Sequence, residues 1–302
     1  MFFLPISKKR GTIIFMKTVR VNVFAKLNLT LDVLGKNGTY HLIDSLVTSV
    51  DLGDQIVVRK RKDSLIHVTM HGMGSESIPP ESNHALRAGE AFCSRFQTTG
   101  ADITVYKNIP IGAGMGGSSA DAAGVLNALS QLYEVGEKEE LEQLANELGS
   151  DVCYMLGGGF QRMCGRGEIL KPLPVTPKLY FLLLVPKHGV STAACYQKID
   201  EYEPVEPATE RAIAFLTAGD IESAAKLFSN GLYRAAKELN PEVAQAYEEL
   251  RSFSPWGVSM TGSGSSVFAV FETPELCAWA KSRYRGKFRA ILLKTIEPTR
   301  KE

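Results

Sequence analysis

A nearly unbroken alternation of apolar and polar residues runs through residues 17–33. One face carries Val19, Val21, Val23, Ala25, Leu27, Leu29, Leu31 and Val33, and the other carries Arg20, Asn22, Phe24, Lys26, Asn28, Thr30 and Asp32. A period of two is typical of β-strands, in which successive side chains point to opposite faces. The pattern predicts strand structure with Lys26 and Asn28 on one face. That face could be exposed to solvent, or it could line a functional site.

Turn and helix signals organise the residues that follow. We expect a turn at 35–38, strands at 51–59 and 65–71, a helix at 83–97 capped by Asn83, a strand at 101–106, a helix from about Ser118, and a helix at 138–148. This order of strands, helix, strand and two helices favours an α+β fold over a regularly alternating parallel sheet.

The pattern resets after the Gly-Gly-Gly run at 157–159. It then predicts a strand at 179–185, helices at 208–228 and 241–251, a strand at 267–271, a helix at 276–284 and a strand at 288–294. A length of 302 residues suggests about two domains. We expect an N-terminal extension at 1–15 and domains at 16–168 and 169–302.

Composition narrows the classes of function. The chain is 44% hydrophobic and 22% charged, as in ordinary globular proteins, and Lys+Arg 34 minus Asp+Glu 33 gives a formal charge of +1. Near-neutrality disfavours a dedicated nucleic-acid binder. Five scattered cysteines without a CxxC pair fit a reducing compartment, and no apolar run is long enough for a membrane helix. We expect a cytoplasmic monomer or homodimer with no nucleic-acid or membrane partner.

The most informative segment is the glycine-rich stretch 107–123, which lies between a predicted strand and a predicted helix. Its glycines allow backbone amides to approach an anion, and a helix beginning at Ser118 and Ser119 directs free N–H groups to the same place. A GxGxxG dinucleotide site is disfavoured because a second helix follows, and a P-loop lacks its Lys-Ser/Thr pair. Two interpretations of segment 107–123 remain, a phosphate-binding loop and a flexible turn.

Two further segments allow two interpretations each. The glycine-serine cluster at 260–266 fits either a tight turn or an anion-binding nest. Asp151, in the segment Gly-Ser-Asp-Val-Cys, fits either a helix cap or a catalytic base.

Taken together, these segments resemble the GHMP small-molecule kinase superfamily over about residues 17–295. Residues 25–29 (Ala-Lys-Leu-Asn-Leu) resemble its first motif, Tyr40-His41 its Gly-Tyr-His element, 110–123 its ATP loop and 260–268 its third motif, while 149–152 and 165–168 match in the expected order. The Tyr-His element and the spelling of the first motif are most similar to members that act on a CDP-linked methylerythritol. Thr39, Ser118 and Cys153 depart from the family pattern, and the loop before the Tyr40-His41 pair is one residue shorter than the expected form.

The resemblance implies an α+β, two-domain GHMP kinase fold. Its N-terminal domain would be ribosomal protein S5 domain 2-like and its C-terminal domain ferredoxin-like, with the active site in the cleft between them. It also implies ATP-dependent phosphorylation of a tertiary hydroxyl, the 2-hydroxyl of the methylerythritol part, with ATP as co-substrate and Mg²⁺ held mainly by phosphate oxygens and water.

Roles for individual residues follow from the same resemblance. Asp151 would be the catalytic base, with the catalytic Lys26 beside it. The ATP-binding residues would be Lys107 near the adenine, and Pro110, Ile111, Gly112, Ala113, Gly114, Met115, Gly116, Gly117, Ser118, Ser119 and Ala120 around the phosphates. The substrate-binding residues would be Asn28, Tyr40, His41, Thr192, Tyr196, Gly262, Ser263 and Gly264, with Tyr40 and Tyr196 stacking on the cytosine. The alternatives are another GHMP kinase, of the homoserine or mevalonate type, and a catalytically weak nucleotide-binding protein.

Overall fold

The computed structural model describes residues 17–72, 74–75 and 78–297, so the expected extension at 1–15 lies outside the described residues. The chain forms two compact units. Unit 1 comprises Met1–Val23, Gly53–Ile109 and Gly117–Leu156, and unit 2 comprises Phe24–Leu52, Pro110–Gly116 and Gly157–Glu302. Two long strands, β1 (Thr18–Asn28) and β3 (Tyr40–Lys60), contribute residues to both units. The division at residue 168 stays a prediction.

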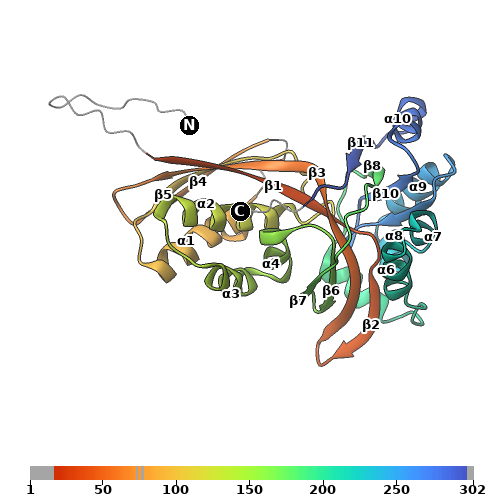
Figure 1. The fold of residues 1–302 in the computed structure, drawn as a ribbon, viewed down its shortest axis with the longest axis horizontal. Helices are drawn as coiled ribbons and strands as arrows, with labels where there is room; N and C mark the ends of the chain where they lie inside the picture. Colours follow the sequence, from red (N-terminus) through yellow and green to blue (C-terminus); the bar gives the residue numbers. More distant parts are fainter. Residues whose placement is uncertain (1–16, 73, 76–77, 298–302) are drawn as a thin grey trace. The chain divides into compact units, whose positions relative to one another are not determined.

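Unit 1 is built from a sheet and a layer of helices. The second half of β3 pairs with β1 and, antiparallel, with β5 (Ala101–Tyr106), and β5 pairs in parallel with β4 (Ile66–His71). The helices are α1 (His84–Phe96), α2 (Gly117–Tyr133), α3 (Lys138–Leu148) and α4 (Ser150–Gly157), with a short 3₁₀ turn η2 at Pro80–Ser82. Helices α1, α2 and α3 pack together on one face of the sheet (Figure 1).

Helix α2 lies close against this sheet because it carries small residues. A Cβ atom at Gly124 would lie 2.5 Å from Val23 and 2.7 Å from Ile56, so only glycine permits this approach. The helix is buried on most of its circumference and rich in alanine, which suits a helix in the centre of a layer. The first turn of α2 is thereby held firmly against the strands.

Unit 2 contains strands of two sheets. One is antiparallel in the order β11-β8-β10-β9, formed by Arg289–Lys294, Tyr180–Val185, Val267–Phe271 and Gly257–Met260. Helices α9 (Pro241–Arg251) and α10 (Pro274–Arg283) pack on it (Figure 1). This strand order with two covering helices is the expected ferredoxin-like arrangement.

The other is the seven-stranded sheet that also contains β1, β4 and β5. In unit 2, the first half of its strand β3 continues into β2 (Asp32–Asn37), β6 (Gln161–Gly165) and β7 (Ile169–Pro172). The remaining helices are α5 (Thr192–Ile199), α6 (Thr209–Thr217), α7 (Ile221–Lys226) and α8 (Tyr233–Leu239).

Most predicted elements are confirmed, including the Asn83 cap, whose side chain accepts hydrogen bonds from the first turn of α1. The single helix expected at 208–228 is wrong. Gly219 adopts a φ of +80° and Asp220 caps a new helix, so α6 and α7 are separate. The expected turn at 35–38 lies at Gly38–Thr39 instead, because β2 continues to Asn37.

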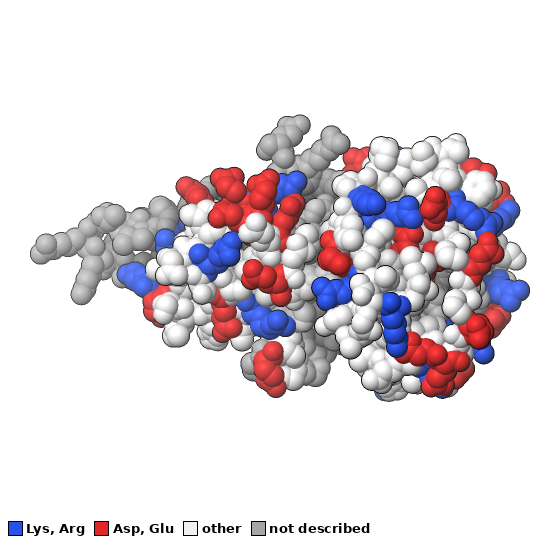
Figure 2. All heavy atoms as spheres, turned by 90° about the horizontal axis from the view of Figure 1, so that it is seen from below, with Lys and Arg blue, Asp and Glu red and all other residues white. Residues whose placement is uncertain are grey.

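Surface charge is mixed. Figure 2 shows Lys and Arg side chains interspersed with Asp and Glu side chains on the visible face of each unit. Within the described ranges, no helix is both long and apolar enough to cross a membrane.

A buried charge cluster in unit 1 lies at the end of β5. The Lys107 ammonium, almost fully buried, donates hydrogen bonds to Asp54 and, over 2.7 Å, to Asp121 on α2. The other Asp54 oxygen accepts from the backbone N–H groups of Asn108 and, over 2.8 Å, Ile109. The cluster therefore joins β3, the end of β5 and the first turns of α2, which flank segment 110–116.

The cluster has one cation for two carboxylates. Burial raises the pKa of Asp121 to about 7, the Lys107 charge opposes this rise, and the Asp54 charge adds to it. One Asp121 oxygen, Oδ1, is buried without a hydrogen-bond partner. The folded protein therefore keeps a proton on Asp121 that the unfolded chain releases.

Replacing Asp121 with Asn should flatten the pH dependence of stability. Between about pH 4 and about pH 7 the parent's unfolded state binds fewer protons than its folded state, so the parent's stability falls as pH rises through this window. Asp121→Asn removes that titration, so its stability relative to the parent should rise with pH. Urea unfolding of both proteins across the window measures the slopes, with the exposed Glu139→Gln as control. Equal slopes in parent and Asp121→Asn would contradict the assignment.

Candidate active site

Lys26 and Asn28, at the end of β1, are buried despite their polarity, with relative exposures of 5% and 1%. The Lys26 ammonium donates a 2.7 Å hydrogen bond to Asn28 Oδ1, and Asn28 Nδ2 donates to Ser45 Oγ over 2.8 Å. The predicted shared face is thus confirmed, and a solvated strand face does not describe these residues. Burial of polar groups requires such hydrogen bonds.

Asn28 also connects the first motif to the third. Its backbone N–H donates to Thr261 Oγ1, and its Oδ1 accepts from the Gly262 N–H, both over 3.1 Å. The Thr261 hydroxyl donates in turn to the Gly114 carbonyl over 3.1 Å. Within unit 2, three segments that lie far apart in the sequence therefore meet through Asn28 and Thr261.

The contact between the two glycine-rich segments requires glycine on both sides. A Cβ atom at Gly114 would lie 2.2 Å from the Thr261 carbonyl oxygen, and one at Gly262 would lie 2.7 Å from the Gly114 oxygen. Both residues have positive φ, +73° and +59°, which glycine adopts without steric cost. The Lys26 N–H donates to the Met115 carbonyl over 3.0 Å and holds the next residue of the loop.

The loop's departures from the family pattern fall where no glycine is needed. Positive φ occurs at Gly112, Gly114 and Gly116, whereas Ser118 already lies in helix α2. The backbone at position 118 is helical, a conformation that residues other than glycine adopt readily. The N–H groups of the first helical turn have no partner within their own helix, so Ser118 and Ser119 stand at an end suited to anions.

Asp151 is the second residue of α4, in unit 1. Ser150 precedes it as the first helical residue, so Asp151 is not the capping residue. A negative charge in the first turn of a helix is favoured by the helix dipole. Asp151 is thus a half-buried residue in the first turn of α4 and not its N-cap.

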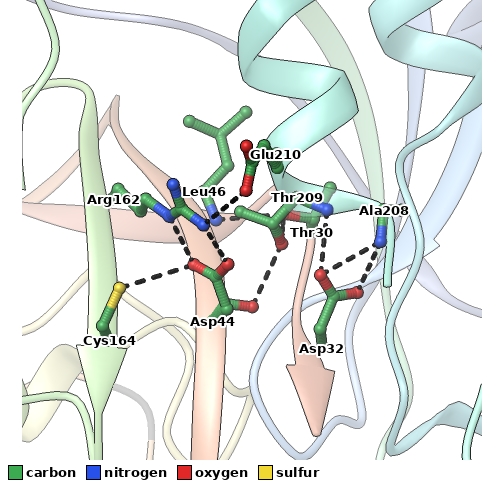
Figure 3. A network of polar contacts seen from close by, with 9 residues as sticks. All are labelled: Thr30, Asp32, Asp44, Leu46, Arg162, Cys164, Ala208, Thr209 and Glu210. Atoms are coloured by element: carbon green, nitrogen blue, oxygen red, sulfur yellow. Dashed lines mark hydrogen bonds and ion pairs between the residues drawn. The ribbon is translucent and has the colours of Figure 1, made fainter. Parts of the chain in front are cut away.

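A buried polar network fixes the base of the β2–β3 hairpin (Figure 3). Asp32 and Asp44 are cross-strand partners. The Asp32 carboxylate accepts hydrogen bonds of 2.9–3.1 Å from the N–H groups of Ala208 and Thr209 at the start of α6. Asp44 forms a two-pronged ion pair with Arg162 of β6, with distances of 2.8 and 2.6 Å. Buried charges paired in this way are costly to separate.

Two threonine hydroxyl groups bind the β3 backbone beside these carboxylates. Thr30 Oγ1 accepts from the Leu46 N–H over 3.0 Å and shares a 2.7 Å hydrogen bond with Thr209 Oγ1. Thr209 Oγ1 also lies 3.1 Å from the Asp44 carbonyl, to which it can donate. Figure 3 shows all these groups converging between the hairpin and α6. The hairpin base is therefore rigid, and its free end carries the Tyr-His element.

Two of the predicted base-binding residues, His41 and Tyr196, lie close together. The His41 and Tyr196 rings are 5.0 Å apart, centroid to centroid, and tilted by 31°. Tyr40 is more than half exposed, and the Arg166 guanidinium lies 4.6 Å from the centre of its ring. Thr39, which precedes it, needs no left-handed backbone because Gly38 takes the positive φ of the turn, +63°.

A cavity of about 200 Å³ adjoins this hairpin in unit 2. Its lining includes Lys36 and His41 from the hairpin, Asp200 from the end of α5, and the segment 202–206. At the start of α5, Thr192 shares a 2.8 Å hydrogen bond with Ser263 of the third motif. Helix α5 therefore joins two groups of predicted substrate residues.

The sequence alone did not reveal several supporting residues. Asp54 and Asp121 accept hydrogen bonds from the Lys107 ammonium. Asn230 donates to the Met260 and Gly262 carbonyls and so holds the third motif. These supporting residues lie far in sequence from their partners, so no sequence spacing predicts the contacts. Asp200 had a usable signal, because it follows Tyr196 by four residues and so lies on the same helix face.

Comparison with known proteins agrees with this geometry. The family model "GHMP kinases N terminal domain" matches residues 83–163, and "GHMP kinases C terminal" matches residues 212–283. A 4-diphosphocytidyl-2-C-methyl-D-erythritol kinase of Shouchella clausii is 37% identical over 82% of this chain and 84% of its own length. The same-named protein of Caldicellulosiruptor saccharolyticus is 35% identical over 91% of this chain and 96% of its own length.

Solved structures give the same result. A crystal structure of 4-(cytidine 5'-diphospho)-2C-methyl-D-erythritol kinase aligns with a TM-score of 0.75 and 31% identity, covering 91% of this chain and 98% of that one. Leishmania major mevalonate kinase, at 14% identity and a TM-score of 0.73, shares the fold. The chain is a GHMP kinase and belongs to the family of the 4-diphosphocytidyl-2-C-methyl-D-erythritol kinases.

Proposed function

We propose that this chain transfers the γ-phosphoryl group of ATP to the 2-hydroxyl of 4-(cytidine 5'-diphospho)-2-C-methyl-D-erythritol. The observation that carries the proposal is the contact between the His41 and Tyr196 rings, in the same unit as the joined glycine-rich segments. GHMP kinases share the ATP loop, whereas an aromatic and imidazole cluster suits a nucleobase. Stacking of a base on an aromatic ring contributes on the order of 1–3 kcal/mol.

The chemical roles follow the needs of phosphoryl transfer. Asp151 accepts the proton of the attacking hydroxyl, and Lys26 stabilises negative charge that develops on its oxygen. Asn28 orients the Lys26 ammonium through their 2.7 Å hydrogen bond. The reaction depends mainly on in-line positioning and charge neutralisation, so fixed side chains matter more than covalent chemistry.

The phosphates of ATP bind along residues 110–120. The donors are loop amides and the first turn of α2, with the hydroxyl groups of Ser118 and Ser119 beside them. Lys107 precedes this segment in the sequence, and its ammonium links Asp54 to Asp121 of α2. We also propose that Mg²⁺ is held mainly by phosphate oxygens and water. Among the described residues, no three His, Cys, Asp or Glu side chains form a cluster suited to a metal.

The CDP-linked alcohol binds through the substrate set predicted from sequence. Tyr40 and Tyr196 stack on the cytosine, His41 reads its edge, and Thr192 and residues 262–264 contact the rest. We propose a monomer or homodimer in the cytoplasm. A reducing compartment suits the five cysteines, all of which are free thiols.

A substrate panel separates this function from its alternatives. With ATP, the protein should phosphorylate the CDP-linked methylerythritol and leave homoserine and mevalonate unchanged, as a coupled ADP-release assay would show. Turnover of homoserine or mevalonate without the CDP-linked alcohol would identify another GHMP kinase. ATP binding without turnover of any of the three would leave a nucleotide-binding protein.

Replacing Asp151 with Asn should strongly reduce turnover and spare nucleotide binding. Removing a general base costs about 10²- to 10⁴-fold in rate. The expected result is a fall of that size in kcat, with the Kd for ATP, from calorimetry, unchanged. Glu147→Gln, an exposed carboxylate on the preceding helix, is the control. An Asp151→Asn enzyme as active as the parent would remove Asp151 from the mechanism.

Replacing Gly114 with Ala should damage the use of ATP. The new methyl group would meet the Thr261 carbonyl at 2.2 Å, so the two glycine-rich segments must separate. We expect kcat/KM for ATP to fall at least about tenfold, since small displacements of positioning groups have large kinetic effects. Gly219→Ala is matched in backbone strain, with a φ of +80°, but has open space around it. Similar ATP kinetics in the two variants would argue against the role of this contact.

A further inference from the structure

Asp200 occupies an electrostatically unusual position. It is the C-cap residue of helix α5, where the carbonyl end of the helix disfavours a negative charge. Two side chains of the β2–β3 hairpin compensate. Lys36 binds one carboxylate oxygen, and His41 Nε2 lies 2.8 Å from the other. The carboxylate therefore joins the hairpin to the helix that carries Tyr196.

The contact with Asp200 determines which nitrogen of His41 carries hydrogen. Hydrogen bonds from Lys36 and then from His41 hold the pKa of Asp200 below its usual value. The carboxylate is therefore ionised at neutral pH, and an ionised carboxylate only accepts hydrogen bonds. The hydrogen between the two side chains must then belong to His41 Nε2. In a neutral imidazole this leaves Nδ1 with a lone pair, as an acceptor.

The rest of the His41 environment leaves Nδ1 available. Asp200 holds one edge of the ring, and the Tyr196 ring contacts its face at 5.0 Å. In the described part of the chain, the bond to Asp200 is the only hydrogen bond of the His41 ring. The imidazole is thus fixed in position and in tautomer, with one unused acceptor beside the cavity that it lines.

We propose that Asp200 is a positioning residue that holds His41 as the Nε2–H tautomer, so that Nδ1 accepts a hydrogen bond from the exocyclic amino group of cytosine. Uracil carries an oxygen in place of that amino group, and two acceptors facing each other repel. The pair would therefore select cytidine-linked over uridine-linked substrates. This inference rests on the proposed function and adds the source of its base specificity.

Asp200→Asn tests the inference because an amide can donate as well as accept. An Asn nitrogen that donates to Nε2 would move the ring hydrogen to Nδ1, which then repels the cytosine amino group and suits the uracil oxygen. We expect the ratio of kcat/KM for the cytidine-linked over the uridine-linked substrate to fall at least about tenfold, mainly through KM. The ¹⁵N NMR shifts of the His41 ring at neutral pH should show the Nε2–H pattern in the parent and lose it in the variant.

Lys36→Met is the matched control. It removes the other partner of Asp200 but keeps the carboxylate as an acceptor, so both the base preference and the Nε2–H pattern should persist. An Asp200→Asn enzyme with the parent's base preference would overturn the inference.

The NMR measurement needs no substrate, so it judges the tautomer separately from turnover. An Nδ1–H pattern in the parent would overturn the inference, even if the cytidine-linked alcohol is phosphorylated. Failure of the parent to phosphorylate the cytidine-linked alcohol would instead overturn the proposed function.

Discussion

The reciprocal hydrogen bonds between Asn28 and the Thr261–Gly262 backbone segment are the constraint on which the rest of unit 2 depends. Asn28 donates from its backbone and accepts at its side chain, while the Thr261 hydroxyl passes the connection on to Gly114. The same Asn28 oxygen receives the Lys26 ammonium. The Asn28 amide thus helps to position Lys26 and the third motif and, through Thr261, the glycine-rich segment around Gly114. Because Lys26, Asn28 and Thr261 are buried, losing one of these partners would leave the others unsatisfied.

This arrangement explains how a nearly neutral protein can bind two polyanions. A formal charge of +1 offers no global attraction, and Figure 2 shows both signs of charge on the visible face of each unit. The cations that the proposal uses are instead tied to neighbours: Lys107 to two carboxylates, Lys26 to Asn28. Affinity must then come from oriented backbone amides and a helix end, whose donors need no reorganisation when phosphate arrives.

Local patterns predicted the elements well, because capping and periodicity are properties of neighbouring residues. Asn83, the strand Val267–Phe271 and the helix Pro241–Arg251 illustrate this. The failures have two causes. Helix 208–228 breaks at Gly219, which takes a positive φ. The polar residues at the end of β1 and just after it are buried because Ser45, Thr209 and Thr261 reach them from distant segments. The motif residues of the site were predicted from family likeness, whereas their supporting partners required the fold.

The distinction between a motif residue and its partner matters for mechanism. A sequence identifies His41 as a group that can donate or accept, but the choice between the two is made by a carboxylate on another element. The same holds for Lys107. From sequence it could be a free cation, whereas in the fold its ammonium bridges Asp54 and Asp121. In both cases the partner fixes the proton or the charge, and so decides what the residue can recognise. Specificity in this protein therefore resides in pairs of residues, and a conservative change in the partner can alter the chemistry of an unchanged motif.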